Sequence, residues 1–127
     1  MSVGTLRAEL AEALEDLERA FPGQVTPEAQ DETGLVVRVS DVALSERWTP
    51  RTGELWFVIP YQYPDAAVYP YHVIGAMPTG GLVTALQSVT WRGMAVTQVS
   101  LRHNAWDPAR DNVVGCVLQT RAWLRAS

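Results

Sequence analysis

Lysine is absent from this sequence and cysteine occurs only once. All ten basic residues are arginines, and they are scattered along the chain. They form no basic stripe of the kind that binds phosphate backbones, so we expect no nucleic-acid partner. The single cysteine, Cys116, excludes an intramolecular disulfide and a multi-cysteine metal site. We therefore expect a reducing compartment, no metal and no cofactor.

Long hydrophobic runs are also missing. The run from Leu55 to Pro60 is among the longest in the chain, and it is far too short to cross a bilayer. The N-terminus has no basic segment followed by an apolar stretch, so it does not resemble a secretory signal. We expect a cytoplasmic protein with no membrane partner.

The composition that remains is that of a globular domain. The chain has 127 residues, of which 47% are hydrophobic and 19% are charged, with a net charge of -4. These values are near the average for folded proteins, and a chain of this length has room for one core. The sequence predicts a single domain over residues 1–127.

Leucine spacing predicts a helix near the N-terminus. Leu6, Leu10, Leu14 and Leu17 recur at the interval of one helical stripe, which indicates an amphipathic helix over residues 5–21. Pro22 and Gly23 end it, because both disfavour continuation of a helix. We expect a loop from there to about Thr33.

Three apolar runs are typical of strands: Leu35 to Val39, Leu55 to Ile59 and Tyr71 to Ile74. Residues 77–81 have loop composition, and residues 96–101 form a short extended segment. Asp107 and Pro108 have the chemistry of a helix start, so a last helix is expected from there through Leu124. This order predicts an α+β fold in which an antiparallel meander sheet carries the N-terminal and C-terminal helices.

Two stretches resemble a known family. Phe57-Val58-Ile59-Pro60 is followed by Tyr63-Pro64 and then by Tyr69-Pro70, and residues 100–108 read Ser-Leu-Arg-His-Asn-Ala-Trp-Asp-Pro. In this order they resemble ubiquitin-conjugating enzymes, and the resemblance is closest to divergent bacterial members. The resemblance covers most of the chain from Thr5 to Leu124. It implies the fold of that family, with Ser100 at the position of the catalytic cysteine.

The resemblance also implies a function and partners. A domain of this family takes the C-terminus of a ubiquitin-like protein from an ATP-dependent activating enzyme and passes it to a target. On Ser100 the bond formed would be an ester. The sequence departs from the family in two respects: the loop from Ser100 to Trp106 is short, and the family's His-Pro-Asn triplet is missing, since Thr90-Trp91-Arg92-Gly93 occupies that region.

Several residues near Ser100 suit this chemistry. A serine hydroxyl needs a base to become a nucleophile, and His103 is the nearest candidate in the sequence. Arg92 and Arg102 are candidates for binding the partner's tail through charge-assisted hydrogen bonds. Asn104 is a candidate for stabilising an oxyanion. The plain alternative for each residue is an exposed loop position with no special role.

Other interpretations of the chain remain open. It is consistent with a non-catalytic variant in which the surface around Trp56 and residues 60–70 binds a ubiquitin-like protein or its activating enzyme without a covalent bond. Ser100 is also what a laboratory replacement of the catalytic cysteine by serine would leave. A third class is an unrelated α+β ligand-binding or assembly domain, since fold does not fix function. Cys116, in the predicted last helix, is expected to be a small buried residue rather than a nucleophile.

Overall fold

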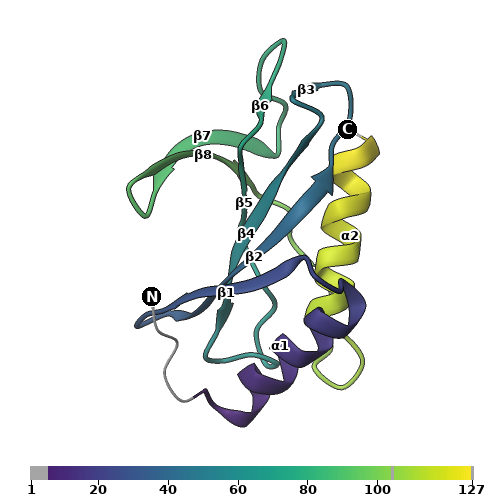
Figure 1. Cartoon of the computed structure of the whole chain (residues 1–127). Coiled ribbons are helices and arrows are strands. Elements are labelled where there is room, and N and C mark those ends of the chain that lie inside the picture. Colours follow the sequence, from purple (N-terminus) through teal and green to yellow (C-terminus); the bar gives the residue numbers. More distant parts are fainter. Residues whose placement is uncertain (1–5, 104, 127) are drawn as a thin grey trace.

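The computed structural model describes residues 6–103 and 105–126, which form an α+β fold. Helix α1 (Ala8–Ala20) precedes the sheet and helix α2 (Val113–Ala126) follows it (Figure 1). The six strands of the main sheet are β1 (Val25–Gln30), β2 (Gly34–Ala43), β4 (Thr52–Pro60), β5 (Tyr71–Ile74), β7 (Leu86–Trp91) and β8 (Met94–Val99). Strands β3 (Trp48–Thr49) and β6 (Met77–Pro78) form a separate two-stranded sheet.

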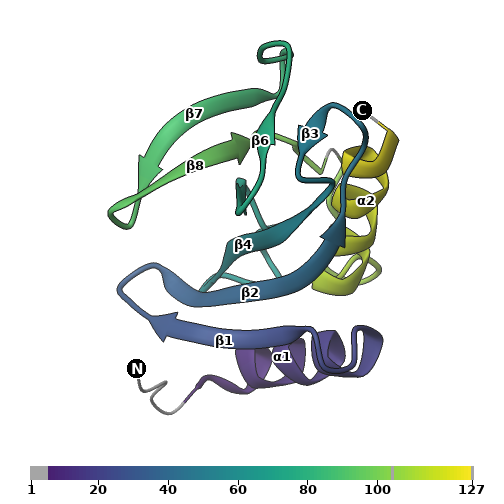
Figure 2. The same ribbon diagram turned by 45° about the horizontal axis from the view of Figure 1, so that its top comes forward.

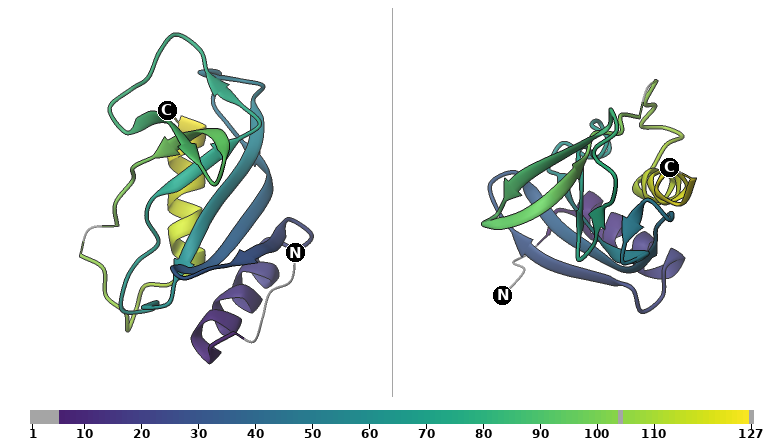
Figure 3. Two further views of the ribbon diagram at one scale, coloured as in Figure 1. Left: turned by 90° about the vertical axis from the view of Figure 1, so that its left-hand side faces the viewer. Right: turned by 90° about the horizontal axis from the view of Figure 1, so that it is seen from above.

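The main sheet is antiparallel throughout, in the order β1-β2-β4-β5-β8-β7. The predicted strands 35–39 and 55–59 lie in β2 and β4 and pair antiparallel, with Leu35 opposite Ile59 and Val39 opposite Leu55. This confirms an α+β fold with an antiparallel sheet and terminal helices. The meander holds only for the first four strands, because β8 rather than β7 pairs with β5. Figures 2 and 3 show the β7–β8 hairpin at the end of the sheet farthest from α1.

Two boundaries differ from the sequence prediction. The expected loop up to Thr33 contains β1, an edge strand whose polar composition and Pro27 hide it from a hydrophobicity pattern. The expected extended segment at 96–101 is the second half of a hairpin that turns at Arg92 and Gly93, both of which have positive φ.

The start of the last helix is also later than expected. Asp107 accepts a hydrogen bond from the Ala109 amide at 2.9 Å, but it caps only a short turn. Helix α2 begins at Val113, whose amide donates to the Tyr63 hydroxyl at 2.8 Å. The Asn112 side chain accepts from the Gly115 amide at 3.0 Å. Asn112 is therefore the N-cap residue, and Pro108 lies outside the helix.

The core lies between the helices and one face of the sheet. Alternate residues of the central strands point inward, among them Val37, Phe57 and Val73, as expected from the period of two along a strand. Helix α1 contributes Leu10 and Leu17 to the same cluster. The predicted helix is confirmed as α1, although it begins at Ala8, so that Leu6 lies before it. Of the predicted leucine stripe, Leu10 and Leu17 are buried, whereas Leu6 and Leu14 pack partly buried against the core. None of the described helices is both long and apolar enough to span a membrane.

The outer face of the sheet, on the side away from this core, carries a buried histidine among tryptophans. The His72 ring stacks on Trp91 with centroids 4.0 Å apart and planes 14° apart. The Trp56 ring meets Trp91 edge-on at 6.2 Å. His72 is only 3% exposed, and its Nδ1 has no hydrogen-bond partner among the described residues. Burial lowers the pKa of His72 to about 4, so the ring is neutral near pH 7.

This burial predicts a pH-dependent stability. The unfolded chain takes up a proton on His72 near pH 6.5, whereas the folded chain does so only near pH 4. The contribution of neutral His72 to the free energy of unfolding is therefore fully present above pH 6.5. It is lost as the pH falls from 6.5 to about 4. Between pH 7 and pH 5 the free energy of unfolding should fall by about 2 kcal/mol through this residue.

Urea unfolding of the wild type, His72→Phe and His103→Gln at pH 7 and pH 5 measures this effect. His72→Phe keeps an aromatic ring against Trp91 but does not titrate, so its stability should lose most of the pH dependence. His103→Gln is the control, and it should keep the decrease due to His72. An equal pH dependence in the wild type and His72→Phe would show that His72 is not the group responsible.

Candidate functional site

Ser100 lies immediately after β8 on the outer face of the sheet. Its amide donates to the carbonyl of Ala85 at 2.8 Å, which continues the β7–β8 ladder by one residue. Its Oγ accepts a hydrogen bond from Gln98 Nε2 at 3.2 Å. Gln98 is opposite His72 in the register, so it points away from the core. The half-buried Ser100 hydroxyl therefore belongs to the outer face.

A pocket of about 300 Å³, which we term the outer pocket, lies beside Gln98. It is lined by Thr33, Val58, Pro60, Tyr69, Pro70, His72, Trp91 and Gln98. The Arg102 guanidinium lies over the Tyr69 ring, 4.1 Å from its centroid. Among the predicted site residues, Ser100 and Arg102 thus border the outer pocket, through Gln98 and Tyr69 respectively.

His103 lies on the other side of the sheet. Its Nε2 is hydrogen-bonded to the hydroxyl of Tyr71, a core residue of β5, and its Nδ1 is 2.8 Å from Gln119 Oε1 on α2. In the tautomer that matches this orientation of Gln119, Nδ1–H donates to Gln119 Oε1 and Nε2 accepts from the Tyr71 hydroxyl. Within residues 6–103 and 105–126, no hydrogen bond joins His103 to Ser100. The structure does not bring the predicted base to the predicted nucleophile.

The loop after Ser100 is held on the helix side by Trp106. The indole Nε1 donates to the carbonyl of Pro64 at 2.7 Å, and its ring lies 6.5 Å from that of Tyr63. The ring of His103 is 6.4 Å from that of Trp106. Trp106 therefore anchors the loop against the Tyr63-Pro64 segment. Because the loop is held there, His103 lies beside α2 and not beside Ser100.

The two remaining predicted binding residues are Arg92 and Asn104. Arg92 lies in the β7–β8 turn, where it forms an ion pair with Asp31 at 2.7 Å and lies over the Trp91 ring at 5.7 Å. Its charge is already matched by Asp31, and no described contact joins it to Ser100. Asn104 lies outside the described residues, so its proposed role in stabilising an oxyanion stays a prediction.

Sequence reasoning missed three residues that shape this region: Gln98, Tyr71 and Gln119. Each contacts a predicted site residue through a side-chain hydrogen bond. The only signal for the first two is their position in a strand, since alternate strand residues face opposite sides. No signal in the sequence indicates that Gln119, an ordinary polar residue of a helix, contacts His103.

Cys116 is a buried residue of α2, as predicted. It is 2% exposed, and burial raises the pKa of its thiol. It lines a small pocket of about 220 Å³ together with His103, Trp106 and Gln119. A thiol with a raised pKa forms little thiolate near neutral pH, so this position does not favour nucleophilic chemistry. No group of three or more metal-ligating side chains occurs in the described part of the chain.

The burial of Cys116 predicts slow thiol chemistry. In the native protein, labelling by a maleimide or disulfide reagent should be at least about 100-fold slower than in urea, because both access and thiolate are limited. A matched control places a thiol on the open face of the same helix: Leu118→Cys in a Cys116→Ala background, since Leu118 is 54% exposed. This variant should label quickly in the native state. Equally rapid native labelling of Cys116 would contradict its burial.

A comparison with known proteins finds no matching family, no matching curated sequence and no matching solved structure. The two features available are the outer pocket beside Ser100 and the hydrogen-bonded His103 on the opposite face.

Proposed function

We propose that this chain is a ubiquitin-conjugating-enzyme-like domain that holds the C-terminal tail of a ubiquitin-like protein in the outer pocket, without forming a covalent bond to it. The observation that carries the proposal is the separation of Ser100 from His103. Ser100 Oγ accepts from Gln98 on the outer face, whereas both ring nitrogens of His103 are bonded on the helix side.

The order of elements supports the family part of this proposal. Helix α1 is followed by β1, β2 and β4 of the main sheet, then by the Tyr63-Pro64 and Tyr69-Pro70 segments and β5. The β7–β8 hairpin, the Ser100–Trp106 loop and helix α2 come after them. The loop is fastened to the Tyr-Pro segment by the Trp106–Pro64 hydrogen bond. This arrangement is the one expected of a domain that presents a loop beside a sheet to a partner.

The chemistry at Ser100 supports binding without transfer. A serine hydroxyl attacks an acyl group only when a base takes its proton. Gln98, which contacts Ser100, carries a neutral amide that does not act as a base. His103 Nε2 is hydrogen-bonded to the Tyr71 hydroxyl. The described residues thus supply no proton acceptor to Ser100.

The outer pocket suits an extended peptide tail. Its walls include Tyr69, Pro70 and Trp91, and its polar groups include the Gln98 amide and a His72 ring that is neutral near pH 7. Aromatic walls with a few polar groups are typical of sites that bind neutral peptide segments. The Arg102 guanidinium over Tyr69 adds a positive charge at the rim, which suits a terminal carboxylate.

A second candidate is the ester-forming carrier, in which Ser100 accepts the modifier. It is favoured by the position of the Ser100 hydroxyl, which is only half-buried and donates no hydrogen bond among the described residues. In this reaction Oγ attacks the carbonyl carbon of a thioester on the activating enzyme, the carbon–sulfur bond breaks, and the hydroxyl proton passes to the leaving thiolate. A base from the activating enzyme would then replace His103.

A binding experiment tests the leading proposal. A ubiquitin-like protein is titrated into the wild type and variants, and affinity is measured by calorimetry. Tyr69→Ala and Arg102→Glu should weaken binding by about tenfold or more, since both remove contacts at the pocket rim. Ser100→Ala should bind as well as the wild type. Arg51→Glu, an equal charge change at another exposed position, is the control and should have little effect.

A second experiment separates binding from transfer. The chain is incubated with the activating enzyme, ATP and the ubiquitin-like protein, and products are separated with and without reductant and hydroxylamine. We expect no adduct that depends on Ser100. An adduct that resists thiols, is cleaved by hydroxylamine and disappears in Ser100→Ala would establish the carrier instead. Failure of the wild type to bind or react would reject both candidates.

A further inference from the structure

The two edges of the main sheet differ in how they are protected. Strand β1 carries Pro27, the charged Glu28 and an irregularity in its register between Pro27 and Ala29. Prolines, charges and bulges are the usual means by which an edge strand avoids pairing with other chains. Strand β7 has none of them: its six residues are uncharged and contain no proline, and its register to β8 is unbroken. The open edge of β7 is therefore competent to accept another strand.

The register identifies the backbone groups that face this open edge. Ala85 and Ser100 form a hydrogen-bonded pair, because the Ser100 amide donates to the Ala85 carbonyl. Hydrogen-bonded pairs alternate along an antiparallel ladder. Residues 87, 89 and 91 therefore bond to β8, whereas the N–H and C=O groups of Ser88 and Thr90 point to the open edge.

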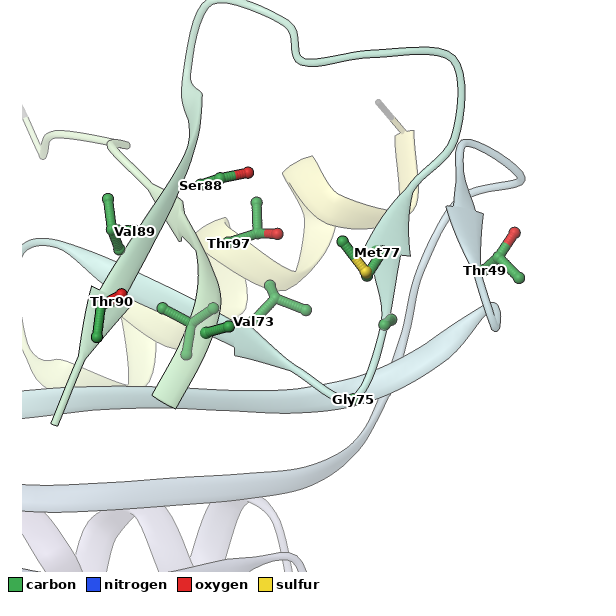
Figure 4. A pocket seen from close by; sticks show the side chains of 11 residues that line it. Thr49, Val73, Gly75, Met77, Ser88, Val89, Thr90 and Thr97 are labelled. Carbon is green, nitrogen blue, oxygen red and sulfur yellow. The ribbon is translucent and has the colours of Figure 1, made fainter. Parts of the chain in front are cut away.

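A cleft lies beside the same two residues. Its volume is about 450 Å³, and it is bounded by β7, β8, β5 and the β6 segment. Figure 4 shows Ser88 and Thr97 on one side of the cleft and Met77 on the other. Val73 contributes to the floor, and none of the described residues that line the cleft is charged. Met77 is 68% exposed, so it presents apolar surface at the edge of the cleft.

We propose that β7 pairs with an extended segment of another protein, which adds an antiparallel strand to the sheet and places alternate apolar side chains in this cleft. A residue paired with Ser88 or Thr90 has its side chain on the same face as theirs, which is the face of the cleft. A neutral, apolar cleft suits valine- or leucine-sized side chains. A second copy of β7 would bring serine and threonine to these positions, so it matches the cleft less well. This surface is independent of the outer pocket, which lies on the opposite face.

Matched peptides test the proposal with the wild-type chain. The probe is a blocked seven-residue peptide of alternating threonine and valine, titrated into the ¹⁵N-labelled protein. The valine side chains should lie on the cleft face. The peptide residues that hydrogen-bond to Ser88 and Thr90 have their side chains on that face, so these residues should be the valines. Methylation of the valine nitrogens should weaken binding by about tenfold or more, whereas methylation of the threonine nitrogens should have little effect. Amide shifts should centre on β7.

Variants of the chain provide an independent test. Ser88→Pro removes an amide that faces the open edge but leaves the ladder to β8, so it should weaken peptide binding by about fivefold or more. Ala95→Leu partly fills the cleft from an exposed position and should also weaken it. Gln87→Ala, whose backbone faces β8, is the control and should bind normally. If Ser88→Pro does not fold, the comparison of the two methylated peptides with the wild-type chain tests the proposal by itself.

Each other outcome overturns the proposal. Peptide binding that is absent at the solubility limit, centred away from β7, or equal for the two methylated peptides would show that the β7 edge does not add this strand. Concentration-dependent self-association of the free chain that is lost in Ser88→Pro would show that a second copy occupies the edge instead.

Discussion

The alternation of side chains along β5 and β8 controls the candidate site. Tyr71 points to the core and His72 to the outer face, and their partners in β8, Val99 and Gln98, follow the same pattern. Neighbouring residues of a strand therefore serve different faces. Ser100 continues the outer face beside Gln98, while the loop that follows it is drawn to the helix side by Trp106. Proximity in sequence does not place His103 beside Ser100.

The elements that could be predicted from the sequence are those with a strong hydrophobic pattern. The Leu35–Val39 and Leu55–Ile59 strands were predictable because their branched apolar residues form dense runs, and α1 because its leucines form one stripe. Strand β1 was missed because an edge strand needs little hydrophobicity and tolerates Pro27. The start of α2 was misplaced because Asp107 and Asn112 both have capping chemistry, and only the tertiary contact from Tyr63 distinguishes them.

The site itself was less predictable than the fold. Ser100 and Arg102 could be named from their place in a motif, but the sequence does not show that Gln98 would contact Ser100 or that Tyr69, in an earlier motif, would lie under Arg102. The two proposals use opposite faces of one sheet, since the outer pocket is lined by His72 and Gln98, whereas the cleft beside β7 is lined by Val73 and Thr97, which face the other way. A domain with both surfaces would bind a tail on one face and an extended segment at its edge. Such a domain would act by bringing two chains together rather than by joining them chemically.

The environment of His103 tests this account most directly. The ¹⁵N and proton shifts of its imidazole report which nitrogen carries the hydrogen and which side chain bonds it. We predict the tautomer protonated on Nδ1, with large changes in these shifts in Tyr71→Phe and Gln119→Ala and little change in Ser100→Ala. A His103 ring whose shifts respond to Ser100→Ala but not to Tyr71→Phe would contradict the account and restore a serine–histidine pair.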